Sequence, residues 1–214
     1  MADLYLVRHG ETEINAEDRF NGGGVDSPLT AKGIAGAEAT RKLLAPVDFA
    51  RVYSSPLPRA MTTTEIIAGA QTPVTIDPRL REMWLGDWDG AKLADWQDDP
   101  EFYLYRHRML EWDYQRYHAE GYEHMADRAR HALVDAAHWL GDRRGLVVSH
   151  GIVLTIMANY LSGVPLNHAR DSGQVANSSV TVLHGDGTNW QILAWNVTAD
   201  TLGELTPAQQ QLFK

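Results

Sequence analysis

The segment Leu4-Tyr5-Leu6-Val7-Arg8-His9-Gly10 starts with a short apolar run and ends in a charged turn that contains a histidine. A second segment, Leu146-Val147-Val148-Ser149-His150-Gly151, repeats this arrangement later in the chain. Such apolar runs are typical of strands that are buried on both faces of a parallel sheet. Because ligands of open α/β sheets bind at the carboxyl ends of the strands, we expect His9 and His150 to face each other there.

Strand and helix patterns alternate along the remaining sequence, which is typical of α/β proteins. Thr30 can cap a helix that runs to about Leu44, and Ser55-Pro56 has the composition of an N-cap and first helical position. Further predicted strands cover 51–54, 74–76, 179–184 and 190–195, and further predicted helices cover 125–140 and 152–161. We predict one domain over residues 1–214, an α/β fold built as a three-layer α/β/α sandwich with a mostly parallel central sheet.

An aromatic-rich segment interrupts this alternation. Residues 84–122 hold ten of the nineteen aromatic side chains, mixed with charges and helix-forming residues. We predict a loop followed by a helical insert over 96–122. Two interpretations stay open: a hydrophobic layer over the sheet edge, which could also form a homodimer contact, or a wall of the substrate pocket.

The composition excludes several classes of protein. The formal net charge is −9, which disfavours general binding to nucleic acid or to an anionic membrane. The absence of cysteine excludes disulfides, thiolate metal sites and cysteine nucleophiles. No segment approaches the roughly 20 apolar residues of a membrane span, and residues 1–8 do not resemble a secretory signal. We therefore expect a cytoplasmic protein.

The two histidine turns suit phosphoryl transfer. A neutral imidazole can attack phosphorus and form a phosphohistidine, which divides one difficult step into two. The charge on the transferred group requires fixed donors around it. Arg8 is one candidate, and Arg59 is another because it is expected in the first turn of a helix, where free N–H groups favour an anion.

Five ordered blocks resemble the motifs of the histidine phosphatase superfamily, in the branch of phosphoglycerate mutases and related phosphatases. They are Leu6–Thr12 with Asn15, Asp26–Gly33, Val52–Ala60, Leu80–Glu82 with Gly86–Gly90, and Val148–Gly151. The resemblance implies that His9 is the nucleophile and that Glu82 protonates the leaving oxygen and then activates the acceptor. It further implies phosphoryl binding by Arg8, Arg59 and His150, with hydrogen bonds from Asn15 and the backbone of Gly151. A glutamate among cations tends to ionise, so we expect Met83 and Trp84 to bury Glu82.

The chain departs from the family pattern at two places. Its loop Arg19–Asp26 is one residue longer and richer in glycine, and we take Asn21 and Gly22 as further substrate-binding candidates there. The family often has Gly-Glu-Ser before the long helix, where this chain reads Gly121-Tyr122-Glu123-His124. The role of that serine is therefore not transferred.

No metal site or cofactor site is expected. His124, His131 and His138 recur every seven residues, but on a helix they are about 10 Å apart along the axis, too far to share one metal. The tri-glycine Gly22-Gly23-Gly24 lacks the ending of a nucleotide P-loop. These features leave a metal-independent site that takes a small phosphorylated substrate and no cofactor.

The sequence thus predicts a phosphomonoester hydrolase that acts through a phosphohistidine on small phosphorylated metabolites. One alternative is a phosphoglycerate-type mutase, although the chain lacks the Arg-Arg-Ser-Tyr and proline-rich segment expected after Trp88. Another alternative is a non-catalytic protein that binds a phosphorylated ligand, which the presence of both His9 and Glu82 disfavours. The sequence does not name the substrate.

Overall fold

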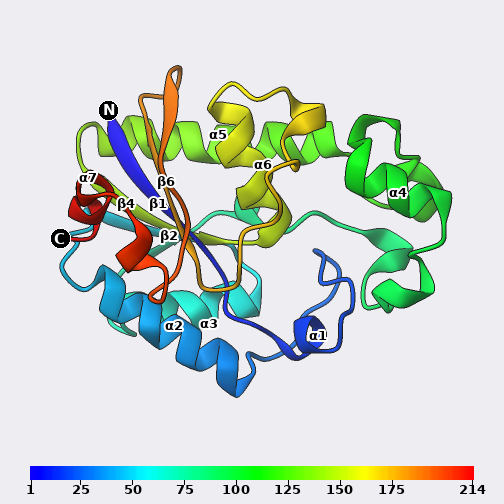
Figure 1. Ribbon diagram of the computed structural model, residues 1–214, viewed down its shortest axis with the longest axis horizontal. Coiled ribbons are helices and arrows are strands. Elements are labelled where there is room, and N and C mark those ends of the chain that lie inside the picture. The colour runs from blue at the N-terminus through cyan, green and yellow to red at the C-terminus, as the bar shows by residue number, and fades with distance from the viewer.

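One six-stranded sheet organises the computed structural model, which describes all residues 1–214 (Figure 1). Its strands are β1 (Ala2–Arg8), β2 (Arg51–Ser54), β3 (Val74–Ile76), β4 (Arg144–Ser149), β5 (Val180–Gly185) and β6 (Trp190–Val197). They lie in the order β3-β2-β4-β1-β5-β6. The first four are mutually parallel, while β5 pairs antiparallel with both β1 and β6. The predicted mostly parallel sheet and the terminal hairpin are confirmed.

Helices cover both faces of this sheet, as Figure 1 shows. They are α1 (Glu13–Ala16), α2 (Ala31–Leu44), α3 (Pro58–Ala68), α4 (Pro100–His107), α5 (Tyr122–Leu140), α6 (Gly151–Leu161) and α7 (Pro207–Gln210). Helices α2 and α3 pack on one face, and α5 and α6 pack on the other. The three-layer α/β/α architecture is confirmed. No helix combines the length and apolar composition that crossing a membrane requires.

The buried central strand β1 explains why two cores form. Leu4 and Leu6 belong to the core under α5 and α6, whereas Tyr5 and Val7 belong to the core under α2 and α3. Successive side chains of a strand point to opposite faces, so a continuous apolar run satisfies both layers. Strand β4 pairs with β1 along its length, and its partner for Arg8 is Ser149. The residues after these two, His9 and His150, therefore leave the sheet side by side.

The predicted helix starts are confirmed in one case and wrong in the other. The side chain of Thr30 accepts a hydrogen bond from Gly33 N and caps α2 as expected. Helix α3, in contrast, begins at Pro58 with Leu57 as its N-cap rather than at Ser55-Pro56. The hydroxyl of Ser55 lies 2.7 Å from Nε2 of His150 instead. Ser55 therefore takes part in a tertiary contact, which the local sequence does not reveal, rather than in a helix cap.

The aromatic segment forms a compact layer at the end of the molecule that holds α4 (Figure 1). Trp88 is fully buried at its centre. Five aromatic rings lie within 5.3 Å of its ring centroid, those of Phe20, Trp96, Tyr105, Trp112 and Tyr117. Burial of such rings removes a large apolar area from water. Tyr105 of this layer also lines the cavity of the candidate site described below.

Candidate active site

The rings of His9 and His150 lie next to each other just beyond the carboxyl ends of β1 and β4. Their centroids are 5.2 Å apart with an interplanar angle of 58°. His9 is 2% exposed and His150 is fully buried. Gly10, which follows His9, leaves no room for a side chain, because an added Cβ would lie 2.6 Å from the carbonyl oxygen of Gly33. The glycine therefore allows α2 to approach the turn that carries His9.

A backbone contact fixes the tautomer of His9. Its Nδ1 lies 2.8 Å from the carbonyl oxygen of Gly10. A carbonyl can only accept, so Nδ1 carries the hydrogen and Nε2 keeps a lone pair. Burial, followed by the charges of Arg59 and Arg8, holds the pKa of His9 well below its usual value. The imidazole is therefore neutral at neutral pH, which is the nucleophilic form.

His150 is held in the same electrostatic environment. Burial is the first cause that lowers its pKa well below the usual value, and the charge of Arg59 is the second. The Ser55 hydroxyl can donate to Nε2, which leaves a hydrogen on Nδ1. That buried Nδ1 has no protein partner. His150 is thus a neutral hydrogen-bond donor beside the nucleophile.

Arg8 supplies a positive charge beside His9. Its Nη1 donates to the carbonyl of Val175 at 2.7 Å, and its buried Nε has no protein partner. Burial lowers its pKa to about 10, which still leaves the guanidinium charged at neutral pH. Buried polar atoms normally find a partner. The free N–H groups of Arg8 are therefore available for an anion.

Arg59 lies in the first turn of α3 and holds the glycine-rich loop. It donates to the carbonyls of Gly22 and Val25 at 2.8 and 2.7 Å and to the carboxylate of Asp26 at 2.8 Å. Its Nε is buried and has no partner. The guanidinium therefore orients the loop with its terminal nitrogens and keeps only Nε as an unused donor.

Glu82 is only 3% exposed, and its carboxylate lies at the N-terminus of α6. Its two carboxylate oxygens accept backbone N–H bonds from Met83, Ile152 and Val153, at 2.9 to 3.3 Å. The expected burial of Glu82 is confirmed; of the two residues next to it, Met83 is fully buried and Trp84 is 43% exposed. Helix α6, rather than Trp84, completes the enclosure of Glu82.

Arg128 on α5 clamps the backbone that carries Glu82. It donates to the carbonyls of Arg79 and Arg81 at 2.7 Å each, and to that of Glu82 at 3.3 Å. Its charge is balanced by Glu120, which accepts from Nε and Nη2 at 2.7 Å. The clamp fixes where the carboxylate of Glu82 can reach.

A cavity of about 160 Å³ opens beside His9. Of the predicted site residues, those that line it are Arg8, His9, Asn15, Asn21 and Glu82. Those that lie outside its lining are Arg59, His150, Gly22 and Gly151. Gly22 contributes its carbonyl to Arg59, and Gly151 starts α6 behind Arg8.

Asn15 reaches the cavity from α1. Its side-chain oxygen accepts from Thr12 N at 3.2 Å and from Nδ2 of Asn21 at 3.3 Å. These bonds assign the amide oxygen as the occupied end and leave Nδ2 of Asn15 as a free donor. An amide donor at this place suits the hydrogen bond to a phosphoryl oxygen that the sequence predicts.

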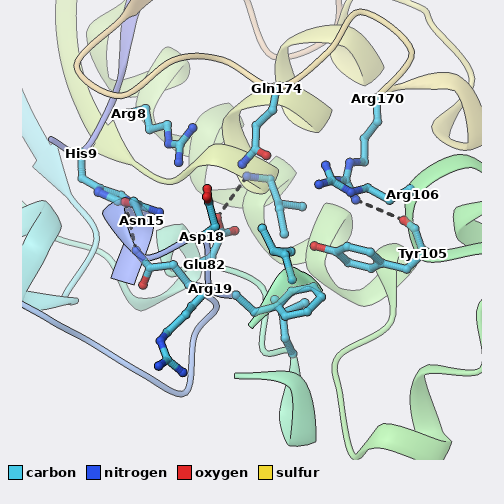
Figure 2. Close-up of a pocket in the computed structure, with 15 residues that line it drawn as sticks. Arg8, His9, Asn15, Asp18, Arg19, Glu82, Tyr105, Arg106, Arg170 and Gln174 are labelled. Carbon is cyan, nitrogen blue, oxygen red and sulfur yellow. Dashed lines mark hydrogen bonds between the residues drawn. The ribbon is translucent and has the colours of Figure 1, made fainter. Parts of the chain in front are cut away.

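Several cavity residues were not predicted from the sequence. Gln174 lines the cavity between Arg8 and Arg170, as Figure 2 shows. Tyr105 and Arg106 also line it and belong to α4. Asn177 donates to the carbonyl of His9 at 3.0 Å. Asn177 itself lies outside the cavity lining, and none of these residues was a candidate in the sequence analysis.

Metal-ligand geometry is not found in the folded chain. No three His, Cys, Asp or Glu side chains gather closely enough to hold a metal ion. His124, His131 and His138 are exposed along α5. The groups around His9 are instead guanidinium, imidazole and amide donors, which bind an oxyanion directly.

Residues 4–198 match the family described as histidine phosphatase superfamily, branch 1. The chain belongs to the histidine phosphatase superfamily. A relative from Salmonella typhi, named "Probable phosphoglycerate mutase GpmB", is 33% identical over 215 residues, which cover 99% of each chain. The superfamily resemblance and the α/β fold predicted from the sequence are confirmed.

Several solved structures share the fold of this chain. YhfR of Bacillus stearothermophilus is 34% identical with a TM-score of 0.84, covering 93% of this chain and 99% of its own. A mycobacterial glucosyl-3-phosphoglycerate phosphatase is 28% identical with a TM-score of 0.82, covering 92% and 99%. The alpha-ribazole phosphatase of Shigella flexneri is 27% identical with a TM-score of 0.79, covering 91% and 96%. This histidine phosphatase superfamily enzyme therefore has structural neighbours that are phosphatases.

Proposed function

We propose that this chain is a metal-independent phosphomonoesterase that hydrolyses small phosphorylated metabolites through a phosphohistidine on His9. The observation that carries the proposal is the tautomer of His9, which is neutral, buried and hydrogen-bonded through Nδ1, with Nε2 free. Three buried donors without protein partners surround it, namely Arg8 Nε, Arg59 Nε and His150 Nδ1. They can receive the oxygens of the transferred group.

The reaction proceeds in two displacements. In the first, Nε2 of His9 attacks phosphorus, the bond from phosphorus to the ester oxygen breaks, and Glu82 gives that oxygen a proton. In the second, Glu82 takes a proton from water, whose oxygen attacks phosphorus while the bond to His9 breaks. The sum is an ester plus water giving an alcohol plus inorganic phosphate. Glu82 is restored after each cycle.

Fixed cationic and neutral donors stabilise the charge of the phosphoryl group. Arg8 and Arg59 carry permanent charge, while His150 and Asn15 donate from neutral groups. Because these donors are positioned before the substrate arrives, they need little reorganisation during the reaction. The proposal therefore assigns no step to a metal ion.

A phosphoglycerate-type mutase is the second candidate, because curated relatives carry that name. A mutase and a phosphatase share the first displacement and differ in the acceptor, which is a substrate hydroxyl in one and water in the other. The structural neighbours named as phosphatases favour water.

Product analysis decides between these two reactions. Purified protein is incubated with 3-phosphoglycerate, and free phosphate and 2-phosphoglycerate are measured together. We expect stoichiometric release of phosphate for a phosphatase. Accumulation of 2-phosphoglycerate without free phosphate would show that a mutase is the correct assignment. The same assay is repeated on a panel of sugar and alkyl phosphates to find the ester that is hydrolysed fastest.

A further inference from the structure

The cavity beside His9 has a second cationic wall that the proposed chemistry does not use. Four of its lining side chains are arginines: Arg8, Arg19, Arg106 and Arg170. Arg19 is balanced by Glu17, whose carboxylate lies 2.6 Å from its Nε. Figure 2 shows Arg106 and Arg170 on the side of the cavity opposite His9, next to Tyr105. The positive charges of Arg106 and Arg170 therefore lie at the end of the cavity away from His9.

Arg170 is held in place without a carboxylate. Its Nη1 donates to the carbonyl of Tyr105 at 3.1 Å and to the hydroxyl of Tyr122, and its guanidinium lies 4.8 Å from the ring centroid of Tyr105. Arg59 and Arg128, by contrast, each pair with an acidic side chain. The Nε and Nη2 groups of Arg170 remain without a protein acceptor, on a side chain that lines the cavity.

Arg106 comes from the last turn of α4 and makes no hydrogen bond or ion pair with the protein. Its guanidinium lies 5.3 Å from the ring centroid of Phe102. Arg108, two residues later, pairs with Glu111 at 2.6 Å and is more than half exposed. The two arginines therefore differ in their partners. Arg106 lines the cavity and its N–H groups have no protein acceptor, whereas Arg108 lies at the surface in an ion pair with Glu111.

Guanidinium groups that leave bulk water gain stability when they meet an anion, and they bind carboxylate or phosphate through parallel N–H bonds. Two such groups on one wall give this part of the cavity a local positive charge, in a chain whose formal net charge is −9. Gln174 lies between the two ends of the cavity and can bond to the part of a ligand that joins them (Figure 2).

We infer that Arg106 and Arg170 form a second anion subsite, so that the substrates are phosphate monoesters bearing a further carboxylate or phosphate group. This inference rests on the proposed function, because it places the ester phosphate at His9. It adds the chemical class of the substrate, which catalytic residues alone do not define. Both arginines are specificity determinants in this assignment and take no part in the bond changes.

The test compares esters that differ only at the far end of one carbon chain. Propyl phosphate is the uncharged reference, the phosphate ester of 3-hydroxypropanoate carries a carboxylate, and 1,3-propanediol bisphosphate carries a second phosphate. We expect kcat/KM to be about tenfold higher or more for at least one of the two esters with a charged far end than for propyl phosphate. A difference of this size is what one hydrogen bond between charged groups typically contributes to binding. A higher kcat/KM for the carboxylate ester would identify the substrate class as phosphate esters of organic acids. A higher kcat/KM for the bisphosphate would identify it as bisphosphates.

Arg106→Gln and Arg170→Gln should each reduce that preference about tenfold, mainly through KM. Arg170→Lys keeps the charge without the planar fork and should recover part of the preference, which separates binding from a purely structural role. Arg108→Gln is the matched control and should leave the preference unchanged. Circular dichroism and melting temperature report whether each variant is folded.

Equal kcat/KM for all three esters in the wild type would overturn the subsite. So would an undiminished preference in folded Arg106→Gln and Arg170→Gln. Failure of the proposed function looks different, because then the wild type would hydrolyse none of the esters, nor p-nitrophenyl phosphate, at a rate above background. The two failures are thus distinguishable in one set of assays.

Discussion

His9 and His150 lie with their ring centroids 5.2 Å apart, although 140 residues of sequence lie between them. The parallel pairing of β1 with β4 produces this neighbourhood, because Arg8 is in register with Ser149. Two imidazoles this close would repel each other if both were charged. Burial and the nearby arginines instead lower both pKa values, so the pair is neutral and can flank a phosphoryl group.

The lowered pKa of His9 predicts the pH dependence of phosphoenzyme formation. The neutral imidazole persists below the usual pKa, so the first step should keep its rate when the pH falls from about 7.5 to about 5.5. An ordinary histidine would lose about tenfold over this interval. Rapid-quench measurement with p-nitrophenyl phosphate follows this step directly. A tenfold loss of this rate centred near pH 6.5 would show that the pKa of His9 is not lowered.

Glu82 should matter in proportion to the basicity of the leaving oxygen. Alkyl esters leave as strongly basic alkoxides and require a proton, whereas p-nitrophenolate leaves readily without one. General acid catalysis contributes about 10²–10⁴-fold, so Glu82→Gln should reduce kcat/KM by that range for alkyl esters and much less for p-nitrophenyl phosphate. Hydrolysis of the phosphoenzyme should also slow, because the base for water is lost.

Glu123→Gln is the control for this measurement, since Glu123 is an exposed carboxylate at the start of α5. It should leave both ester types unaffected. Equal losses on both esters in Glu82→Gln, together with a lowered melting temperature, would instead mark Glu82 as a structural acceptor for the N-terminus of α6.

Removal of metal ions should leave activity intact. In the proposed mechanism Arg8 and Arg59, with neutral donors beside them, balance the charge on the phosphoryl group, so treatment with EDTA should not lower kcat. Vanadate can adopt the geometry of a phosphoryl group in transfer and should inhibit by binding the same donors. A strict requirement for added magnesium or manganese would contradict this prediction.

Asp89 couples the glycine-rich loop to pH. Its carboxylate accepts from Gly24 N at 2.8 Å and Leu85 N at 3.3 Å, and burial raises its pKa to about 6. The folded state therefore holds a proton on Asp89 that the unfolded state releases at lower pH. The stability from this group is fully present below about pH 4 and is lost as the pH rises through about 6.

Asp89→Asn removes this titration. The unfolding free energy of the wild type relative to the variant should thus decrease as the pH rises from about 4 to about 7, measured by urea unfolding at several pH values. Using the difference between the two proteins removes the opposite contribution of the buried histidines, which favours folding at higher pH. A difference that is flat across this interval would contradict the raised pKa.

The elements of the fold could be predicted because each has a local signature. The runs that form β1 and β4, and the Thr30 cap of α2, depend on neighbouring residues alone. The start of α3 could not be predicted in the same way, because the hydroxyl of Ser55 contacts His150, which is distant in the sequence. Long-range contacts override a local capping preference at this position.

The candidate site shows the same division. His9, His150 and Arg59 were identified from their positions after strands or at the start of a helix, while Glu82 was identified only through family resemblance. Their roles stay predictions. The engagement of Arg59 with the carbonyls of the glycine-rich loop, and the arginines of α4 and of the segment after α6, depend on how the insert packs. No spacing in the sequence reports that packing.

The most direct test is to identify the phosphorylated residue. The wild type is mixed with ³²P-labelled p-nitrophenyl phosphate, quenched in alkali within milliseconds, and the labelled peptide is mapped. We predict an acid-labile, base-stable label on His9, no label in His9→Ala, and a loss of turnover in that variant of about 10⁴-fold or more. His138→Ala, which removes an exposed histidine of α5, should label normally. Label on a serine, or active turnover with no phosphoenzyme at any time point, would contradict covalent catalysis by His9.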